Sequence, residues 1–422
     1  MIRFIFKGLM RDRQRSLLPI IVVVIGVFLT VILQTMMTGI LGDMVAFNAN
    51  FATGHVKIMT RAYAERVDQT PNDLALAKTD KLLESLQKDY PDMEWIQRIR
   101  FGGLIDAPDA QGETRSQGPA IGWGIDLLSP DSKESDRMNI AKSIIKGSIP
   151  EHAGEVLISN MFADKLKVVP GDQITLLGST MNGSMTVYNF KVAGTVKFGS
   201  NVLDRGAIIA DIRDVQLALD MSGSASEILG YFKTNYYDKD QAAANVARFT
   251  KSSDPADPFS PVMVSLRDQN GLASMVDYMD VVSVIIISIF VMAMSLVLWN
   301  AGLLGGLRRY GEVGVRLAVG ESKGHVYRSM VSESILVGII GSVIGSTIGL
   351  SISFMVQKHG LDVSGYMKNA SMMMPSVFRT EISFTSFYIG FIPGLFATVI
   401  GTALAGIGIY KRNTAQLFKE LE

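Results

Sequence analysis

Four long apolar segments stand out from an otherwise mixed pattern of polar and apolar residues. They cover residues 17–40, 276–299, 331–356 and 384–409. Each is long enough to cross about 30 Å of hydrocarbon as an α-helix. The first exceeds the apolar core of a typical cleaved signal peptide, and no convincing small-x-small cleavage site follows it. The pattern therefore predicts an uncleaved membrane anchor followed by three further transmembrane helices.

The block of residues 41–275, between the first and second apolar segments, has the pattern of a folded aqueous domain. Strand and helix patterns alternate and are separated by Pro, Gly and Asp turns. A strand-helix-strand order near the start recurs near the end, where Asp238 is the expected N-cap of the second helix. We predict a porter-like α+β part, about 41–112 and 225–275, interrupted by an inserted β-rich subdomain, about 113–224. The predicted fold class is four transmembrane α-helices with a large α+β extracytoplasmic domain inserted between helices 1 and 2.

The inserted subdomain contains several candidate strands. Alternation along the longest of them places Thr186, Tyr188, Phe190 and Val192 on one side. A turn containing Gly171 separates the short helix at residues 161–166 from the candidate strand at residues 173–177. The candidate strands are residues 156–159, 173–177, 186–196 and 207–210, and the short helix is residues 161–166.

Basic residues predict the orientation of the chain. Lys and Arg are dense in residues 1–16, in the loop 300–330 and in the tail 410–422, but sparse in the loop 357–383. By the positive-inside rule, the first three of these segments face the cytoplasm and the loop 357–383 lies outside. Residues 1–16 also form a predicted interfacial helix, with a basic stripe for lipid headgroups. That stripe comprises Arg3, Lys7, Arg11 and Arg15.

The loop 300–330 contains a short amphipathic helix between two membrane helices. At helical spacing, Leu307, Tyr310, Val313 and Leu317 form an apolar face, and Arg308, Glu312 and Arg316 form a charged face. Glu312 four residues before Arg316 is the favourable order for an ion pair, worth about 0.2–0.5 kcal/mol. This pattern favours a contact surface for another molecule. The alternative is a helix that only lies at the membrane surface.

Small residues recur at four-residue spacing within two of the apolar segments. They are Gly341, Gly345 and Gly349 in one series, and Ala397, Gly401 and Ala405 in the other. Such spacing lets helix backbones approach closely. Two interpretations remain open, namely contact across a dimer and ordinary packing within one four-helix unit.

Composition and motifs give no support for catalysis. The 422 residues include 40 basic and 40 acidic ones, so no basic excess favours nucleic acid. Cysteine is absent, which excludes disulfides, thiolate metal sites and thiol nucleophiles. The four histidines are scattered, and neither a GxSxG elbow nor a GxxxxGK[ST] phosphate loop is present. Met372, Met373 and Met374 raise the possibility of copper ligation, but apolar contact is the favoured interpretation. We therefore predict a non-catalytic chain with no cofactor or metal of its own.

The order of these features resembles the FtsX-like permeases, the membrane subunits of lipoprotein-releasing and macrolide-exporting ABC transporters. The resemblance covers the whole chain and includes its basic ends and the Glu155-Val156-Leu157-Ile158-Ser159 strand. Further motifs are Arg308-Arg309-x-x-Glu312-x-Gly314-x-Arg316-x-Ala318-x-Gly320, Lys167-Val168-Val169-Pro170-Gly171-Asp172 and the terminal Tyr410-Lys411-Arg412. One departure is Tyr310-Gly311, where the family more often has polar or charged residues.

The resemblance implies a machine driven by ATP hydrolysis in another chain. Similar permeases pair with a second copy or a paralogue and bind a cytoplasmic ABC ATPase dimer, which holds the ATP and magnesium. Closure of the ATPases then moves the external domains, which is called mechanotransmission. The implied ATPase-coupling residues are Leu307, Arg308, Arg309, Glu312, Val313, Arg316 and Leu317.

The expected function is release of lipoproteins from the bacterial inner membrane, with both termini cytoplasmic. Residues 54–58, Gly-His-Val-Lys-Ile, look closer to the lipoprotein-releasing branch than to the macrolide branch. The alternatives are efflux of a macrolide, peptide or other amphiphile, a signalling permease that controls an extracytoplasmic cell-wall enzyme, and a receptor without an ATPase. Expected partners besides the ATPase are a lipoprotein or amphiphilic substrate, a periplasmic acceptor or adaptor, and membrane lipid.

Overall fold

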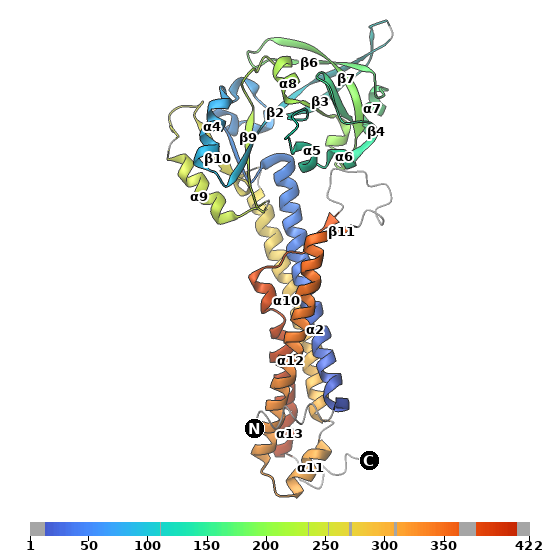
Figure 1. Cartoon of the computed structure of the whole chain (residues 1–422), viewed down its shortest axis with the longest axis vertical. Helices are drawn as coiled ribbons and strands as arrows, with labels where there is room; N and C mark the ends of the chain where they lie inside the picture. The colour runs from blue at the N-terminus through green and yellow to red at the C-terminus, as the bar shows by residue number, and fades with distance from the viewer. Residues whose placement is uncertain are drawn as a thin grey trace. The chain divides into compact units, whose positions relative to one another are not determined.

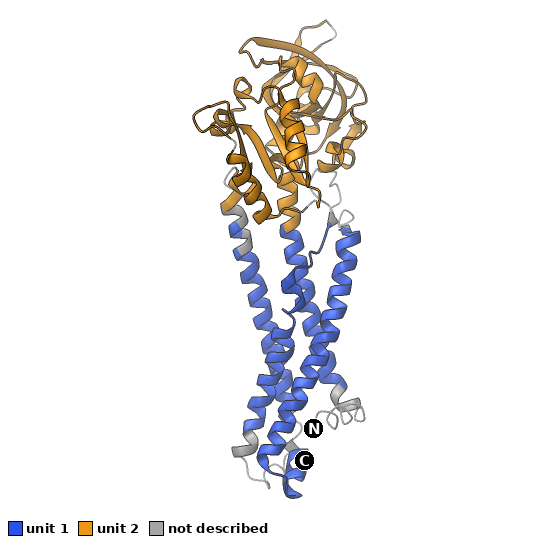
Figure 2. Cartoon of the chain, turned by 60° about the vertical axis from the view of Figure 1, so that its left-hand side comes forward, with its two compact units in different colours: residues 1–41, 277–362, 377–422 blue, residues 42–276, 363–376 orange. Residues whose placement is uncertain are grey.

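The computed structural model describes residues 13–109, 111–234, 236–251, 253–269, 272–307, 310–362 and 377–411. The chain divides into two compact units, coloured separately in Figure 2. Unit 1 comprises Met1–Leu41, Asp277–Asp362 and Val377–Glu422, and unit 2 comprises Gly42–Val276 and Val363–Ser376. Four helical segments are long and apolar enough to cross a membrane, namely Leu17–Thr53, Val281–Gly305, Lys323–His359 and Phe384–Ile407. These findings confirm the predicted fold class, with the large α+β domain between the first and second membrane helices.

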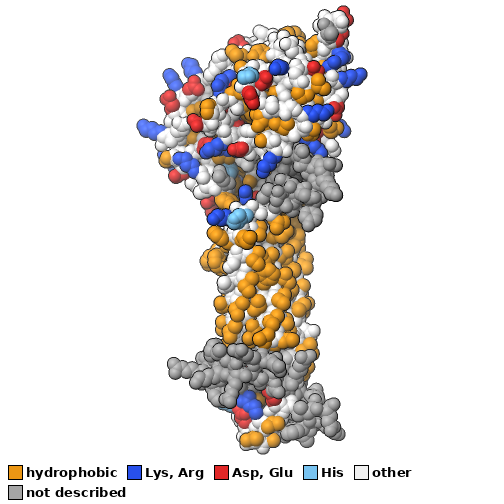
Figure 3. All heavy atoms as spheres, turned by 45° about the vertical axis from the view of Figure 1, so that its right-hand side comes forward, with side chains coloured by type: hydrophobic (Ala, Val, Ile, Leu, Met, Phe, Trp, Pro, Cys, Tyr) orange, Lys and Arg blue, Asp and Glu red, His pale blue; other side chains and the backbone are white. Residues whose placement is uncertain are grey.

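Long helices form unit 1 (Figure 1). They are α2 (Arg13–Asn48), α10 (Leu272–Leu307), α12 (Lys323–His359) and α13 (Thr398–Lys411), with the short α11 (Tyr310–Ala318) between α10 and α12. Helices α2 and α10 extend into unit 2 at their outer ends. Valines of α2 fill the core of unit 1 together with residues from the other three long segments. On the face shown in Figure 3, hydrophobic side chains cover most of the middle of the described helices, as expected for contact with lipid, and charged side chains appear at the lower end.

The fourth membrane segment is broken, whereas the sequence predicted one helix over residues 384–409. It consists of a 3₁₀ turn (Phe384–Phe387), a π-helical turn (Ile392–Ala397) and then α13. Pro393 cannot donate a backbone hydrogen bond, which favours the irregularity. Gly394 packs tightly, since a Cβ there would lie 2.4 Å from a methyl group of Val27. The irregular backbone is therefore shielded by protein, as it must be at membrane depth.

The porter-like part of unit 2 is a four-stranded antiparallel sheet in the order β10-β1-β9-β2. Its strands are β1 (Val56–Thr60), β2 (Met93–Pro108), β9 (Glu227–Phe232) and β10 (Pro261–Ser265). Apolar side chains of helices α4 (Thr79–Asp89) and α9 (Lys239–Thr250) pack against this sheet. The two predicted strand-helix-strand units are confirmed. Asp238 caps α9 as expected, because its carboxylate accepts hydrogen bonds from the N–H groups of Asp240 and Gln241.

The β-rich part of unit 2 is a closed ring of strands in the order β2-β3-β8-β5-β7-β6, with β6 pairing back onto β2. The further strands are β3 (Thr114–Ile125), β5 (Glu155–Ser159), β6 (Gln173–Ser179), β7 (Met185–Val196) and β8 (Ala207–Asp211), with β4 (Ile144–Gly147) beside β7. Its apolar core includes Phe190 and Val192 of β7, which were predicted to share one side of the strand, and the structure shows that this side faces inward. The ring also includes residues 99–108 of β2, which the sequence analysis grouped with the porter-like part.

Strand β3 is the main element that the sequence analysis missed. Its three glycines hide the alternation that marks a strand. Each glycine makes room for a larger side chain, and a Cβ on Gly122 would lie 2.1 Å from the ring of Phe101. Helices α7 (Asn160–Leu166) and α8 (Ile212–Ala218) contribute Phe162 and Val215 to the core of the ring.

Short elements complete the described chain. They are α3 (Arg61–Glu65), η2 (Val67–Gln69), η3 (Asn72–Leu74), α5 (Glu134–Arg137), α6 (Ile140–Ser143), η4 (Leu203–Arg205), η5 (Leu266–Asp268), β11 (Leu361–Asp362) and β12 (Val377–Phe378). Among them, α5 contacts the porter-like sheet through two ion pairs, Glu134 with Arg98 and Arg137 with Glu94.

Candidate coupling site

Helix α11 carries the charged segment that the sequence analysis singled out, and it packs on α12. Val313 is only 2% exposed and contacts Val326 and Met330, with Leu317 at the margin of the same cluster. Val313 and Leu317, two members of the apolar face predicted from spacing, therefore pack against a neighbouring helix of the same chain. This packing holds α11 to the long helix α12.

The turn between α11 and α12 has a well-defined geometry. Gly320 has a φ of +99°, which favours glycine. Its N–H donates to the carbonyl of Leu317 at 3.1 Å, and the N–H of Glu321 donates to the carbonyl of Arg316 at 3.0 Å. These two bonds form a Schellman motif, which ends a helix while satisfying its last carbonyls. Gly320 of the sequence motif therefore provides the left-handed residue that ends α11.

Arg316 forms a forked ion pair with Glu321. Its Nε and Nη2 atoms each lie 2.6 Å from a carboxylate oxygen. The sequence analysis did not anticipate this partner, because the turn is what brings Glu321 back onto the guanidinium. Hydrogen bonding to Arg316 lowers the pKa of Glu321, which favours the charged form of the carboxylate. The pair links the last turn of α11 to the start of α12.

The face of α11 turned away from α12 is exposed and mixed in character. It includes Glu312, Val315 at 47% exposure and Val319, just past the helix, at 84%. Helical spacing places these three residues on one side. Leu307, at the end of α10, is 38% exposed. The sequence analysis missed the two valines because it weighed the other apolar face.

Several predicted site residues lie outside the described chain. They are Arg3, Lys7, Arg11, Arg308, Arg309, Met372, Met373 and Met374. Arg15 belongs to α2 near its first turn. The predicted basic stripe and interfacial helix therefore remain predictions.

The glycines of α12 lie against α2 of the same chain. A Cβ on Gly341 would lie 2.6 Å from Val23, and one on Gly345 would lie 2.7 Å from the carbonyl oxygen of Val24. Gly349 meets Val31 in the same way. This geometry provides an intrachain contact for the first small-residue series.

The second small-residue series also lies inside unit 1. A Cβ on Gly401 of α13 would lie 2.3 Å from the carbonyl oxygen of Trp299 on α10. Ala397 and Ala405 are 7% and 4% exposed. Of the two interpretations left open by the sequence, ordinary packing within one four-helix unit accounts for these contacts.

Unit 2 buries an ion pair and a neutral histidine. The Lys57 ammonium lies 2.6 Å from the Glu227 carboxylate, and both side chains are 1% exposed. The His55 Nδ1 atom accepts a hydrogen bond from the backbone N–H of Phe232 at 3.0 Å. Burial, reinforced by the positive charge of Arg137, lowers the pKa of His55 to about 4. These groups therefore have structural partners within unit 2.

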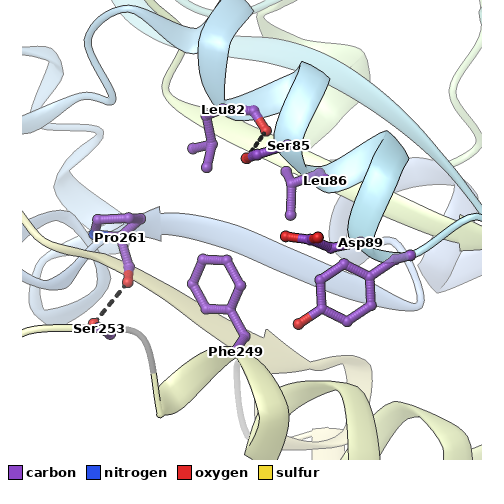
Figure 4. A pocket seen from close by; sticks show the side chains of 8 residues that line it. Leu82, Ser85, Leu86, Asp89, Phe249, Ser253 and Pro261 are labelled. Carbon is purple, nitrogen blue, oxygen red and sulfur yellow. Dashed lines mark hydrogen bonds between the residues drawn. The ribbon is translucent and has the colours of Figure 1, made fainter.

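A small pocket of about 230 Å³ lies between α4 and α9 (Figure 4). Leu86 and Phe249 contribute apolar surface, and Asp89 adds a carboxylate. Ser85 and Ser253 donate their hydroxyls to the carbonyls of Leu82 and Pro261, at 2.7 and 2.9 Å. Within the described ranges, no group of three or more metal-ligating side chains comes together.

Comparison with known families accounts for both units. Residues 16–268 match the MacB-like periplasmic core domain, and residues 284–414 match the FtsX-like permease C-terminal domain. The first match alone covers more than half of the chain. The chain therefore belongs to the FtsX-like permeases of ABC transporters. Permeases of this family work with a cytoplasmic ABC ATPase and are generally non-catalytic subunits.

Within that class, the external domain is of the MacB-like type. The crystal structure of the periplasmic region of MacB from Actinobacillus actinomycetemcomitans matches with a TM-score of 0.36 and 10% sequence identity. The match covers 55% of this chain and 95% of that one. A search of curated protein sequences finds no match.

Proposed function

We propose that this chain converts ATP hydrolysis in a cytoplasmic ATPase into movement of its periplasmic domain, and that it acts on lipoproteins or related amphiphiles. It works as a dimer with a second copy or a paralogue, and both termini face the cytoplasm. The observation that carries this proposal is α11, a short helix packed on α12 with an exposed face of its own. Force applied to that face reaches the membrane helices because α11 is tied to them.

The contacts at α11 support a role in transmission. Its buried face, the Schellman turn and the Arg316–Glu321 pair all connect it to α12. A helix held at several points moves with its neighbour, whereas a helix held only by flexible ends would absorb the motion. The exposed residues Glu312, Val315 and Val319 are the proposed contact for the ATPase.

Residues 54–58, which suggested the lipoprotein branch, are explained by folding instead. Gly54 has a φ of +62°, and His55 and Lys57 are buried with partners inside unit 2. This stretch therefore does not support one substrate over another. The lipoprotein proposal rests on the resemblance to the lipoprotein-releasing members of the family.

A charge placed on the exposed face of α11 tests the coupling. Val315→Asp is expected to lower ATPase activity of the assembled complex at least tenfold, because a contact on this face would bury a carboxylate that has no partner of opposite charge. The measurement is ATP turnover after co-purification of the chain from native membranes with its ATP-binding subunit. Membrane insertion should be unchanged, since Val315 is 47% exposed and lies outside the buried cluster of Val313, Val326 and Met330.

The matched control is Val187→Asp, on the outward side of β7, where the valine is 65% exposed. It introduces the same charge into unit 2 and should leave ATP turnover unchanged. Equal activity of native and Val315→Asp complexes would remove α11 as the coupling site. Failure to recover any ATP-binding subunit with the native chain would instead favour the receptor alternative.

Photo-crosslinking tests the substrate class. Crosslinking amino acids at exposed positions of unit 2, such as Met185 and Val202, are expected to capture lipidated proteins in whole cells. Mass spectrometry of the adducts identifies the acyl chains. Capture of small molecules alone would favour the efflux alternative, and capture of a cell-wall hydrolase would favour the signalling alternative.

A further inference from the structure

The end of the first membrane helix is fastened to the porter-like sheet by side chains from three separate elements. After Asn48 the helix continues in one π-helical turn, Ala49–Thr53 (η1), which belongs to unit 2. The last carbonyls of a helix have no partners within it and must find them elsewhere. Here side chains donate hydrogen bonds to four carbonyls of this turn, which belong to Ala49, Asn50, Phe51 and Thr53.

Arg98 of β2 is the centre of this arrangement. Its Nη2 and Nη1 atoms donate to the carbonyls of Asn50 and Phe51, both at 2.8 Å. Its Nε lies 2.6 Å from the carboxylate of Glu134 on α5, and the arginine is fully buried. A positive charge at the carboxyl end of a helix is favourable because the helix dipole is negative there. Arg98 therefore joins the membrane helix, the sheet and α5 at one point.

Two other residues complete the arrangement. The Tyr231 hydroxyl of β9 donates to the carbonyl of Ala49 at 3.0 Å. The Gln269 amide donates to the carbonyl of Thr53 at 3.2 Å. The carbonyl of Gln269 in turn accepts from the N–H of Leu272, the first residue of α10, at 2.8 Å. Gln269 thus connects the end of the first membrane helix with the start of the second.

We infer that Arg98, Tyr231 and Gln269 form a clamp that makes the outer end of α2 and the porter-like sheet move as one rigid body. They are positioning residues, since they hold the helix and touch no substrate. Movement of α2 then reaches the sheet without loss, and through Glu134 it also reaches α5. Local rigidity is a property of the chain itself, whereas its use during ATP hydrolysis rests on the proposed function.

The charges around Arg98 explain why the clamp stays intact. Burial alone would lower the pKa of Arg98, but Glu134, Tyr231 and Glu227 together outweigh burial and raise it. Arg137 of α5 pairs with Glu94 at 2.7 Å, and its guanidinium lies 4.3 Å from the centre of the Tyr231 ring. Arg137 also lies 3.4 Å from Glu134. The side chains that bond to the carbonyls of residues 49–53 in the described chain are those of Arg98, Tyr231 and Gln269, so Arg137 provides a matched control in the same surroundings.

Hydrogen exchange of the full chain in lipid nanodiscs tests the rigidity. The N–H of Gly54 bonds to the carbonyl of Ala49 and that of His55 to the carbonyl of Gly230, so both report on opening of the turn. Arg98→Lys keeps the charge beside Glu134 but loses the fork to the carbonyls, and should speed exchange of these amides about tenfold. Tyr231→Phe, a milder variant that removes only a hydroxyl, should speed it about threefold.

The control Arg137→Lys should leave both exchange rates unchanged. Unchanged exchange in Arg98→Lys and Tyr231→Phe, or an equal increase in Arg137→Lys, would overturn the clamp. If Arg98→Lys fails to fold, Tyr231→Phe alone decides the outcome.

Distances between spin labels test the movement. The chain has no native cysteine, so Met44→Cys on α2 and Ala244→Cys on α9, both exposed, give one specific label pair. With the partner ATPase bound, addition of ATP should leave this distance narrow and unchanged in the native chain. In Arg98→Lys the distribution of distances between the two labels should broaden or shift with ATP while ATP turnover persists.

An ATP-dependent shift of this distance already present in the native chain would overturn the clamp. Absence of any bound ATPase would overturn the proposed function, and the exchange rates would still decide the clamp.

Discussion

Replacement of Glu227 with glutamine is expected to lower the free energy of unfolding by about 3–5 kcal/mol, because it leaves a buried charge without its partner. The carboxylate lies 2.6 Å from the Lys57 ammonium, and both side chains are 1% exposed. Arg100 and Arg98 add further positive charge near Lys57. The loss should appear as a decrease of roughly 10 °C in the melting temperature of unit 2, measured on the full chain in nanodiscs.

The pH dependence of this variant follows from the same charges. Burial lowers the pKa of Lys57, and the nearby Glu227 opposes that shift. Without Glu227, the folded state binds the lysine proton more weakly than the unfolded state, so stability rises as the pH increases. The difference between Glu227→Gln and the native chain should therefore shrink toward alkaline pH.

Two controls separate the buried pair from general charge effects. Lys57→Met combined with Glu227→Met removes both charges and should recover most of the lost stability. Lys133→Met breaks the exposed pair with Glu94, in which the lysine is 64% exposed, and should cost about 1 kcal/mol or less. A Glu227→Gln variant as stable as Lys133→Met would contradict the structural role given to the pair.

Gly401→Ala is expected to destabilise unit 1 by about 1–3 kcal/mol, since the added methyl group cannot fit. A Cβ at this position would lie 2.3 Å from the carbonyl oxygen of Trp299, a backbone atom that can move only with α10. Gly305→Ala on α10 is the matched control, because among the described residues nothing beyond its own stretch of helix lies within 4 Å of its Cβ position. The measurement is thermal loss of monodisperse protein, followed by size-exclusion chromatography.

The control should be neutral or slightly stabilising, because alanine favours helix more than glycine does. The same experiment tests the alternative interpretation of the small-residue series. If Gly401→Ala melts like Gly305→Ala but dissociates a dimer, then Gly401 contacts a second copy and not only α10.

The sequence was sufficient for elements whose signal is local. Alternation identified β7, hydropathy located the four membrane segments, and Asp238 marked the start of α9. Strand β3 was missed because its glycines make room for Phe101, Phe162 and Val215, which come from elsewhere in the chain. A glycine chosen for a distant neighbour gives no local sign of a strand.

The candidate site shows the same division. Helical spacing correctly grouped Val313 with Leu317, but only the position of α12 shows that this face is covered. The partner of Arg316 depends on a left-handed glycine in the turn, which brings Glu321 into reach. Arg98 gave no signal at all, because arginine is normally exposed and its partner Glu134 lies 36 residues away.

Strand β2 pairs with β9 through residue 98 and with β3 from residue 99 onward, so one strand of 16 residues serves both the sheet and the ring. Chimaeras that exchange the β-rich part between permeases are a natural way to transfer substrate preference. A junction at the apparent boundary near residue 113 would split the pairing of β2 with β3. Junctions should instead fall before Met93 and after Phe232, so that β2 is transplanted whole together with β9, which keeps Arg98 and Tyr231 on their own strands.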